Sequence, residues 1–318
     1  MGNKMKQIVV LGGTGFVGSH LVHRLSAAGY RVKVLTRRRE DGKHLFLLPN
    51  VQVEECDVFF DSAFSRAIRG SHAVINLIGI LHESRRNTFE RMHAELPRRV
   101  AQACRNEGVP RLLHMSALQA AQDAPSAYLR SKALGEAAVW EAVGDAVGVT
   151  MFRPSVIFGR GDSFLNLFAL LAKWMPLIVL AKPEARFQPL FVEDVAEAFV
   201  RSLSTPETVG QAYALCGPKV YTLRELVRKV LEVLHLCRPV VGLNDRLSYL
   251  QAAMMELLPV KLMTRDNVRS MEVPSVCDCT FPEVFGFQPA TLESVVGTYL
   301  ADDTTRARYL GFRAHAGR

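Results

Sequence analysis

A tyrosine and a lysine four positions apart, Tyr128 and Lys132, stand in the stretch YLRSK. Residues at this spacing share one face of a helix, so the two side chains would lie together. A lysine ammonium beside a phenol favours the phenolate and would lower the pKa of Tyr128 from its usual value of about 10. Such a tyrosine can pass a proton to or from a carbonyl oxygen while a hydride moves at the carbonyl carbon.

Ser116, twelve positions before Tyr128, closes the stretch LLHMSA. A serine hydroxyl there would hold the carbonyl oxygen, and Lys132 would also bond the ribose of the hydride carrier. The alternative interpretation is a tyrosine and a lysine on the surface of an amphipathic helix. The two interpretations differ in whether a cofactor site lies nearby, so the rest of the chain decides between them.

A glycine-rich stretch, GGTGFVG, places Gly12, Gly15 and Gly18 in G-x-x-G-x-x-G spacing between an apolar run and a helical pattern. In that context the spacing is typical of a dinucleotide site. Gly12 permits a tight turn, Gly15 lets the backbone approach a pyrophosphate, and Gly18 lets the helix pack on the sheet. The free N–H groups of Phe16 and Val17 would point at the phosphates from the helix N-terminus.

The end of the second apolar run, VLTRRRE, discriminates between nucleotides. An NAD site wants an acidic residue there for the ribose 2′-hydroxyl, and an NADP site wants arginine for the 2′-phosphate. The sequence offers Arg37, Arg38 and Arg39, and its first acidic residue, Glu40, comes too late. Guanidinium groups suit a phosphate by charge and by bidentate geometry. NADP(H) is therefore favoured over NAD(H), with a solvated basic loop as the alternative.

Two later strand ends would contribute to the same site. Asp57 and Val58 follow the third apolar run, where the Asp57 carboxylate either hydrogen-bonds an adenine amino group or caps the next helix. Asn76, Ile78 and Gly79 end the fourth run, where the backbone would pass the adenosine ribose.

The elements that must position these residues alternate regularly. Strands are expected in 6–13, 30–36, 51–58, 71–79, 110–117 and 148–159, and helices in 16–29, 61–70, 87–108 and 126–143. Each strand is a short apolar run, and each helix has apolar residues at helical spacing. This alternation predicts an α/β fold, a Rossmann doubly wound parallel sheet with helices on both faces.

The regular alternation of strands and helices ends after Gly161. We expect residues 1–160 to form the nucleotide-binding domain, with segments of about 186–220 returning to it. Residues 161–185 and 221–300 would form a smaller, mostly helical C-terminal domain for a substrate or partner, and 301–318 a basic tail.

The composition is that of a globular protein, with 49% hydrophobic residues and a formal net charge of +8. No nucleic-acid-binding motif accompanies that charge, so nucleic acid is not an expected partner. The six cysteines lack C-x-x-C spacing, which predicts reduced thiols and no metal site. The N-terminus lacks signal-peptide features. We expect a cytoplasmic protein, with peripheral attachment to the cytoplasmic membrane as the alternative.

The apolar stretch 164–181, FLNLFALLAKWMPLIVLA, is interrupted by Lys173 and Pro176. The interruptions argue against a transmembrane span and for an amphipathic helix followed by a turn. Such a helix would belong to the core, face a partner, or rest on a bilayer.

The glycine loop, the Ser116–Tyr128–Lys132 set and the stretches FRPSVIFGRGD and FVEDVAEA occur in an order that resembles the extended branch of the short-chain dehydrogenase/reductase superfamily. The resemblance covers about residues 6–225. VINLIGI, SAYLRSKALGE and SVIFGRGDSFLNLFA further resemble the NADPH-holding accessory subunits of respiratory complex I and their bacterial relatives.

The resemblance implies that Thr14 joins the pyrophosphate loop, that Arg37 and Arg38 bind the 2′-phosphate, and that Pro154 and Ser155 cover the nicotinamide. There are departures from the family pattern. His93 stands where the family often has asparagine, and it would be either a proton relay or a histidine packed in the helix. The spacing from Ser116 to Tyr128 is shorter than in many relatives, which puts the role of the serine in doubt.

Two functions remain open, with a nucleotide-sensing role as a third. One is an NADPH-dependent reductase of a quinone or another hydrophobic carbonyl compound. The other is a non-catalytic subunit that holds NADPH and docks on a membrane respiratory complex. The resemblance to the complex I subunit implies this function, because in that subunit the nucleotide has a structural role.

Overall fold

The computed structural model describes residues 5–257 and 262–300, so the basic tail expected at 301–318 lies outside the described residues. The chain divides into two compact units. The first comprises the chain up to Pro154 together with Glu193–Leu215 and Pro282–Phe287. The second comprises Ser155–Val192, Cys216–Phe281 and the chain from Gln288.

A seven-stranded parallel sheet forms the centre of the first unit. Its strands are β1 (Gln7–Leu11), β2 (Arg31–Thr36), β3 (Val51–Glu55), β4 (Ala73–Asn76), β5 (Arg111–Met115), β6 (Gly148–Pro154) and β11 (Gln211–Leu215). They lie in the order β11-β6-β5-β4-β1-β2-β3. The strand order reverses between β1 and β4, and open α/β sheets bind ligands at such a switch point. The predicted doubly wound fold is confirmed.

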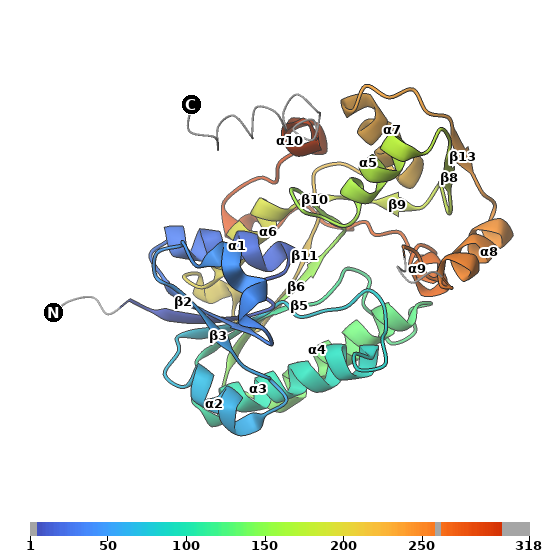
Figure 1. The fold of residues 1–318 in the computed structure, drawn as a ribbon. Coiled ribbons are helices and arrows are strands. Elements are labelled where there is room, and N and C mark those ends of the chain that lie inside the picture. Colours follow the sequence, from blue (N-terminus) through green and yellow to red (C-terminus); the bar gives the residue numbers. More distant parts are fainter. Residues whose placement is uncertain (1–4, 258–261, 301–318) are drawn as a thin grey trace, which may run out of the picture. The chain divides into compact units, whose positions relative to one another are not determined.

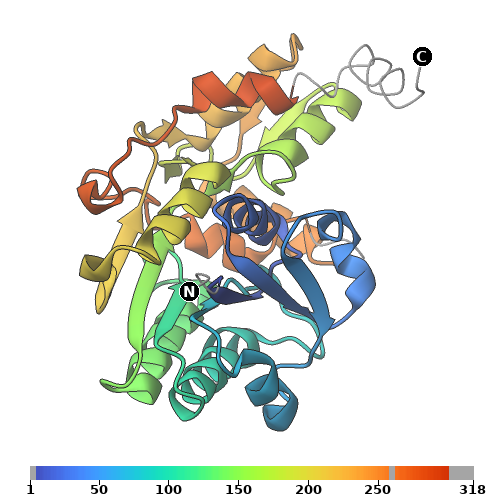
Figure 2. The same cartoon turned by 90° about the vertical axis from the view of Figure 1, so that its left-hand side faces the viewer.

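Helices cover both faces of this sheet (Figures 1 and 2). On one face lie α1 (Phe16–Ala27) and α6 (Val192–Ser202), and on the other α2 (Asp61–Ile68), α3 (Leu96–Asn106) and α4 (Ala127–Val143). The predicted helix at 87–108 contains a π-helical turn, η2 (Glu90–Glu95), and 3₁₀ turns form η1 (Arg39–Leu45), η3 (Pro206–Thr208) and η4 (Glu283–Phe285).

The sheet is held by apolar side chains on both faces, as expected for parallel strands between helices. The β4 strand is buried at every position. Beneath it, Val100 and Cys104 of α3 and Val139 of α4 belong to one buried cluster with Val74 of β4. These contacts place the N-terminal turns of α4, and with them Tyr128 and Lys132, beside the ends of the strands.

The second unit contains short strand pairs and helices. The pairs are β7 (Ile157–Phe158) with β10 (Leu190–Phe191), β8 (Ile178–Leu180) with β13 (Val240–Gly242), and β9 (Arg186–Phe187) with β12 (Tyr221–Thr222). The helices are α5 (Leu165–Trp174), α7 (Leu223–Val233), α8 (Asp245–Met255), α9 (Arg265–Ser270) and α10 (Leu292–Leu300). Leu226 and Val230 of α7 are buried in this unit against Leu165 of α5.

One cysteine expectation is wrong. A disulfide joins Cys216 to Cys277, with the Cα atoms 6.1 Å apart. The Gln188 side chain brings the two together, because its Oε1 accepts from the Cys277 N–H at 3.0 Å and its Nε2 donates to the Gly217 carbonyl at 2.6 Å. The two cysteines are 61 positions apart in sequence, so spacing alone carries no signal of this contact.

Within residues 5–257 and 262–300, no helix combines the length and apolar character needed to cross a bilayer. The same residues contain no group of three or more His, Cys, Asp or Glu side chains arranged to hold a metal ion.

Candidate functional site

The register of the parallel sheet brings the predicted site residues of the first unit to one edge. Leu11 at the end of β1 pairs with Leu35 of β2 and with Asn76 at the end of β4. Asn76 in turn pairs with His114 of β5, and Met115 pairs with Phe152 of β6. The glycine loop, the arginines after β2, and Ser116 after β5 therefore all leave the sheet at its carboxyl edge.

The glycine loop has the geometry that its spacing predicts. Gly12 has a φ of 76°, which glycine adopts without steric cost, and its carbonyl accepts the Gly15 N–H at 3.1 Å. A Cβ on Gly18 would lie 2.1 Å from the Gly12 oxygen, so only glycine lets α1 approach the loop this closely. Gly15 is exposed, while Thr14 is half-buried. The α1 helix begins at Phe16, which leaves the N–H groups of Phe16 and Val17 in its first turn without intrahelical partners.

The arginines after β2 differ in their surroundings. The Thr36 hydroxyl donates to the Arg38 carbonyl at 3.1 Å and fixes the turn. The Arg39 guanidinium lies over the Phe46 ring, 5.3 Å from its centroid. Arg37 and Arg38 are exposed, and within the described part of the chain no carboxylate forms an ion pair with either. These two guanidinium groups are therefore available for an anion.

Asp57 acts locally as a turn cap, because its Oδ1 accepts the Phe59 N–H at 3.0 Å. Its side chain is exposed, and the neighbouring Val58 is buried. At the end of β4, the Asn76 Oδ1 accepts the Ile78 N–H at 3.1 Å and holds the turn that leads to Gly79. A Cβ on Gly79 would lie 3.6 Å from both the His93 Nε2 and the Lys132 Nζ atoms.

His93 is a packed histidine that holds other site residues in position. Its Nε2 accepts the Ile80 N–H at 2.9 Å, and its Nδ1 lies 2.8 Å from the Ser131 hydroxyl, which itself donates to the Tyr128 carbonyl. These partners assign the proton to Nδ1. Burial lowers the pKa of His93 to about 3, so the ring is neutral at physiological pH. Of the two alternatives for His93, the structure has the packed one.

His93 also contacts the predicted catalytic tyrosine. The Tyr128 ring meets the His93 ring edge-on with centroids 5.5 Å apart, and Phe89 flanks both rings. A Cβ on Gly135 of α4 would lie 1.8 Å from the His93 carbonyl oxygen. The π-helical turn and α4 therefore approach each other closely at Gly135. Sequence spacing did not reveal Ser131 or Gly135 as supports of the site.

Lys132 and Ser116 lie side by side at the end of β5. The Lys132 ammonium is buried and donates to the carbonyl of Met115, the residue before Ser116, at 2.8 Å. The Ser116 N–H donates to the Phe152 carbonyl at 2.7 Å. The Ser116 hydroxyl is buried, and among the described residues it has no hydrogen-bond partner. A buried polar atom without a partner calls for an explanation, and a bound ligand is one.

The expected pKa of Tyr128 is wrong in direction. Burial raises the pKa of Tyr128 to about 12 instead of lowering it. Burial also lowers the pKa of Lys132 to about 8, although the Glu136 carboxylate opposes this shift. Loss of solvation is the main cause of the pKa shift at both groups. At neutral pH the tyrosine is therefore a phenol that can donate its proton.

Pro154 and Ser155, the residues predicted to cover the nicotinamide, belong to different units. Pro154 ends β6 in the first unit, where its carbonyl accepts the Leu118 N–H at 2.9 Å. Ser155 begins the second unit, and its hydroxyl donates to the Ser275 carbonyl at 2.7 Å.

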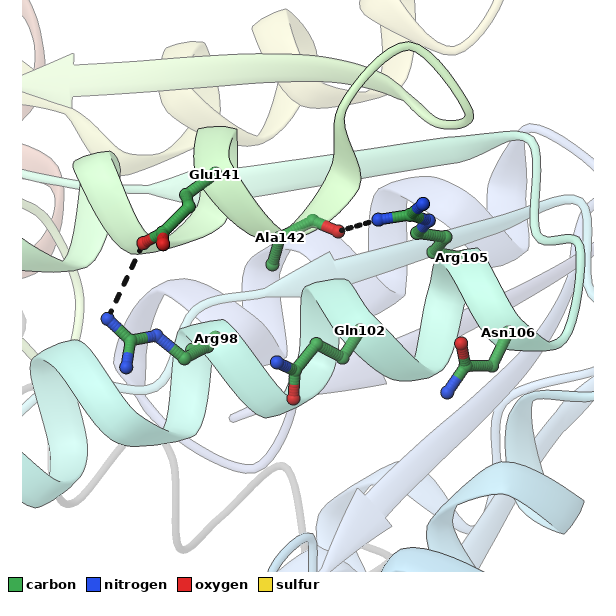
Figure 3. Close-up of a pocket in the computed structure, with 6 residues that line it drawn as sticks. All are labelled: Arg98, Gln102, Arg105, Asn106, Glu141 and Ala142. Carbon is green, nitrogen blue, oxygen red and sulfur yellow. Dashed lines mark hydrogen bonds and ion pairs between the residues drawn. The ribbon is translucent and has the colours of Figure 1, made fainter.

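A separate pocket of about 550 Å³ lies on the outer side of α3 and α4 (Figure 3). Arg98 forms an ion pair with Glu141 across it, and Arg105 donates to the Ala142 carbonyl. Gln102 and Asn106 complete its polar lining. None of these residues belongs to the predicted nucleotide or catalytic set, so the pocket is distinct from the carboxyl edge of the sheet.

Comparison with known proteins identifies the family of the chain. Residues 8–216 match the NAD dependent epimerase/dehydratase family, a family of dinucleotide-binding proteins. The chain is 34% identical over 294 residues to the mouse mitochondrial NADH dehydrogenase [ubiquinone] 1 alpha subcomplex subunit 9, covering 89% of this chain and 77% of that one. It is also 34% identical over 201 residues to the ceramide reductase of Caulobacter vibrioides, covering 63% and 61% of the two chains.

Among solved structures, the UDP-glucose 4-epimerase of Thermotoga maritima superposes with a TM-score of 0.73 at 16% identity, over 93% of this chain and 97% of that one. This likeness concerns the fold. Because the matching region runs from the first strand of the sheet to its last and contains the glycine loop and the Ser116–Tyr128–Lys132 set, the chain belongs to the NAD dependent epimerase/dehydratase family.

Proposed function

We propose that the protein binds NADP(H) at the carboxyl edge of its first unit and reduces the carbonyl group of a hydrophobic compound, such as a quinone. The observation that carries this proposal is the Ser116 hydroxyl, which is buried with no hydrogen-bond partner among the described residues. It adjoins the carbonyl that holds the Lys132 ammonium. A carbonyl oxygen of a bound compound would give this buried hydroxyl the hydrogen-bond partner that it lacks among the described residues.

The residues present fit a dinucleotide. The first-turn N–H groups of α1 and the exposed Gly15 would hold the pyrophosphate, since a helix N-terminus favours anions. Arg37 and Arg38 would hold the 2′-phosphate, because their guanidinium groups have no carboxylate partner among the described residues. Bound NADPH supplies the hydride for the reduction.

The chain's own residues would handle the oxygen and the proton. The phenol of Tyr128 donates its proton to the carbonyl oxygen as negative charge develops there, and Ser116 donates a hydrogen bond to the same oxygen. A neutral phenol is the form required for this direction of reaction, and the raised pKa of Tyr128 maintains it. An isolated carbonyl becomes an alcohol and a quinone becomes a hydroquinone, in each case by gain of one hydride from the nucleotide and one proton from Tyr128.

The relatives support two versions of this function. The ceramide reductase of Caulobacter vibrioides supports an enzyme that reduces a lipid-like compound. The mouse subunit of NADH dehydrogenase supports a chain that is a subunit of a respiratory complex. In the second version the same site binds NADPH without turnover.

Tyr128→Phe separates the two versions. If the protein is a reductase, this variant loses NADPH oxidation by a short-chain quinone about a hundredfold or more, because the proton donor is gone. Its NADPH affinity stays within about twofold, because the ring still fills its place between His93 and Phe89.

The wild type supplies the comparison. Wild-type protein that releases stoichiometric NADPH on denaturation, but neither exchanges nor oxidises it, would establish the nucleotide-holding version. Quinone-dependent oxidation that persists in Tyr128→Phe would exclude Tyr128 as the proton donor.

A further inference from the structure

The second unit exposes a run of large apolar side chains on adjoining elements. We call this surface the apolar face. It consists of Trp174, Met175, Leu177, Val179, Val241, Leu247, Leu250, Met254 and Leu257. Trp174 is 80% exposed and Leu257 86%. Isolated apolar residues on a surface need no explanation, but a contiguous group of this size marks an interaction site.

One half of the apolar face is the outer side of a strand pair. Val179 of β8 pairs with Val241 of β13, and both are exposed. Their neighbours Ile178 and Leu180 are buried, as the alternation of a strand requires. Leu177 precedes β8 on the same side as Val179, and Trp174 and Met175 lead into it from the end of α5.

The other half is a stripe along α8. Leu247, Leu250 and Met254 recur at spacings of three and four residues and so share one side of the helix. All three are exposed, while Ser248 and Ala252 on the opposite side are fully buried. The helix therefore has a second apolar side that its own unit does not cover.

Hydrogen bonds join the two halves into one surface. The Gln251 Nε2 of α8 donates to the Val179 carbonyl of β8 at 3.4 Å. At the start of the helix, the Ser248 hydroxyl accepts the Lys182 N–H at 3.0 Å, just beyond β8. The α8 stripe thus runs beside the exposed side of β8.

The charges around the apolar face are mainly positive. Residues 170–182, 236–257 and 262–270 hold six basic and three acidic side chains. Of the acidic ones, Asp245 pairs with Lys182 at 2.9 Å and Glu256 with Arg265 at 2.8 Å. Arg246 is exposed on α8 next to the stripe and adds a cation.

We propose that the apolar face rests on a lipid bilayer that contains anionic lipids. A tryptophan and long aliphatic side chains with basic residues around them are the composition of surfaces that lie in the interfacial layer. Basic residues near an anionic membrane surface add attraction. The helix is short and would lie along the membrane plane. This attachment is independent of the nucleotide site, because every residue of the apolar face belongs to the second unit.

Vesicle co-sedimentation of the full-length chain tests the proposal. We expect wild-type protein to bind vesicles of phosphatidylcholine and phosphatidylglycerol more than phosphatidylcholine alone, and less in high salt. The double variant Leu250→Asp/Met254→Asp should lose about tenfold or more of this binding, because two charges would enter the acyl boundary. Both positions are exposed, so the variant keeps its fold, which circular dichroism verifies.

Leu47→Asp is the matched control, because Leu47 is 94% exposed on the first unit and should leave vesicle binding unchanged. In a Trp140→Phe background, the emission of Trp174 should shift to shorter wavelength when vesicles are added. Wild-type protein that binds neither vesicle composition overturns the proposal. So does a wild type that ignores vesicles but self-associates through a contact that Leu250→Asp/Met254→Asp breaks, since a second copy would then cover the face.

Discussion

Lys132 is an ammonium group placed where burial disfavours its charge. It is 4% exposed and donates a hydrogen bond to the carbonyl of Met115. A buried cation with so few partners reduces stability, and such costs concentrate at functional sites. This cost is consistent with the proposed role of Lys132 at the nucleotide site.

Replacing Lys132 by methionine should therefore stabilise the protein. The folded protein releases the Lys132 proton near pH 8, while the unfolded chain keeps it to about 10.4. Between those values the unfolded state binds more protons, so the free energy of unfolding of the wild type should rise with pH. Lys132→Met should abolish this rise and be about 2–3 kcal/mol more stable at pH 7. Urea unfolding between pH 7 and 10.5 measures both, and a slope unchanged in the variant would contradict the assignment.

Arg37 and Arg38 should set the nucleotide preference. The double variant Arg37→Ala/Arg38→Ala should weaken NADPH binding by about thirtyfold to a thousandfold, because each lost charge-assisted contact with the phosphate is worth about 1–2 kcal/mol. NADH binding should stay within about twofold, since NADH lacks that phosphate. Fluorescence titration of the reduced nicotinamide measures both affinities.

Arg39→Ala is the control for that pair, because it removes a charge from the same loop but from a guanidinium that lies over Phe46. An equal loss of NADPH and NADH affinity in Arg37→Ala/Arg38→Ala would mean that the two arginines act only on the shared pyrophosphate.

Much of the local geometry of the candidate site could be predicted from the sequence. The predictions that failed have a common cause. The glycine spacing predicted the turn at Gly12 and the close approach at Gly18, because both depend only on local backbone. The pKa of Tyr128 was predicted in the wrong direction, because it depends on burial by Phe89 and His93 from another element. The sequence pattern indicates which residues lie near one another along a helix, but it does not indicate how deeply they are buried.

At the scale of elements, the π-helical turn and α4 depend on the small size of Gly135. A Cβ there would lie 1.8 Å from the His93 carbonyl oxygen, so Gly135→Ala must push the two helices apart. We expect a loss of about 1–3 kcal/mol in the free energy of unfolding. Chemical denaturation measures it, together with weaker binding of nucleotide as Tyr128 moves.

Gly297→Ala in α10 provides the matched change, because nothing lies within 4 Å of the Cβ it would add. Alanine is the better helix former, so this variant should be neutral or more stable by up to about 1 kcal/mol. A Gly135→Ala variant as stable as the wild type would show that the two helices separate without cost.

The disulfide should stabilise the second unit. It closes a loop of 61 positions between Cys216 and Cys277, and breaking it restores conformational freedom to the unfolded chain. Cys216→Ser should lower the free energy of unfolding by about 2–4 kcal/mol. Cys237→Ser, at an exposed free thiol, is the control and should have no effect. Equal stability of wild type and Cys216→Ser under oxidising conditions would argue against the bond.

Elements were predictable where they are long and periodic. Strands β1 to β6 and helices α1 to α4 follow from apolar runs and helical spacing, whereas β11 was expected only as part of a segment that returns to the first domain. The two-residue strands β7, β9, β10 and β12 are too short to show a period, and the π-helical turn has the same residue types as the α-helix it interrupts. These features arise from packing between segments distant in sequence.

At the scale of the whole molecule, the two proposed sites belong to different units. The first unit contains the glycine loop, Arg37, Arg38 and the Ser116–Tyr128–Lys132 set, while the second contains the apolar face. The formal net charge of +8 suits both an anionic nucleotide and an anionic surface. The same division accommodates a reductase of a hydrophobic compound and a nucleotide-holding subunit, since both need nucleotide on one unit and attachment on the other.

The most direct test of the central claim is a titration of the nucleotide-free wild-type protein with NADPH and with NADH, followed by calorimetry. The account predicts that NADPH binds at least about tenfold more tightly, because only NADPH offers a phosphate to Arg37 and Arg38. Equal affinity for the two nucleotides, tighter binding of NADH, or no binding of either would contradict it.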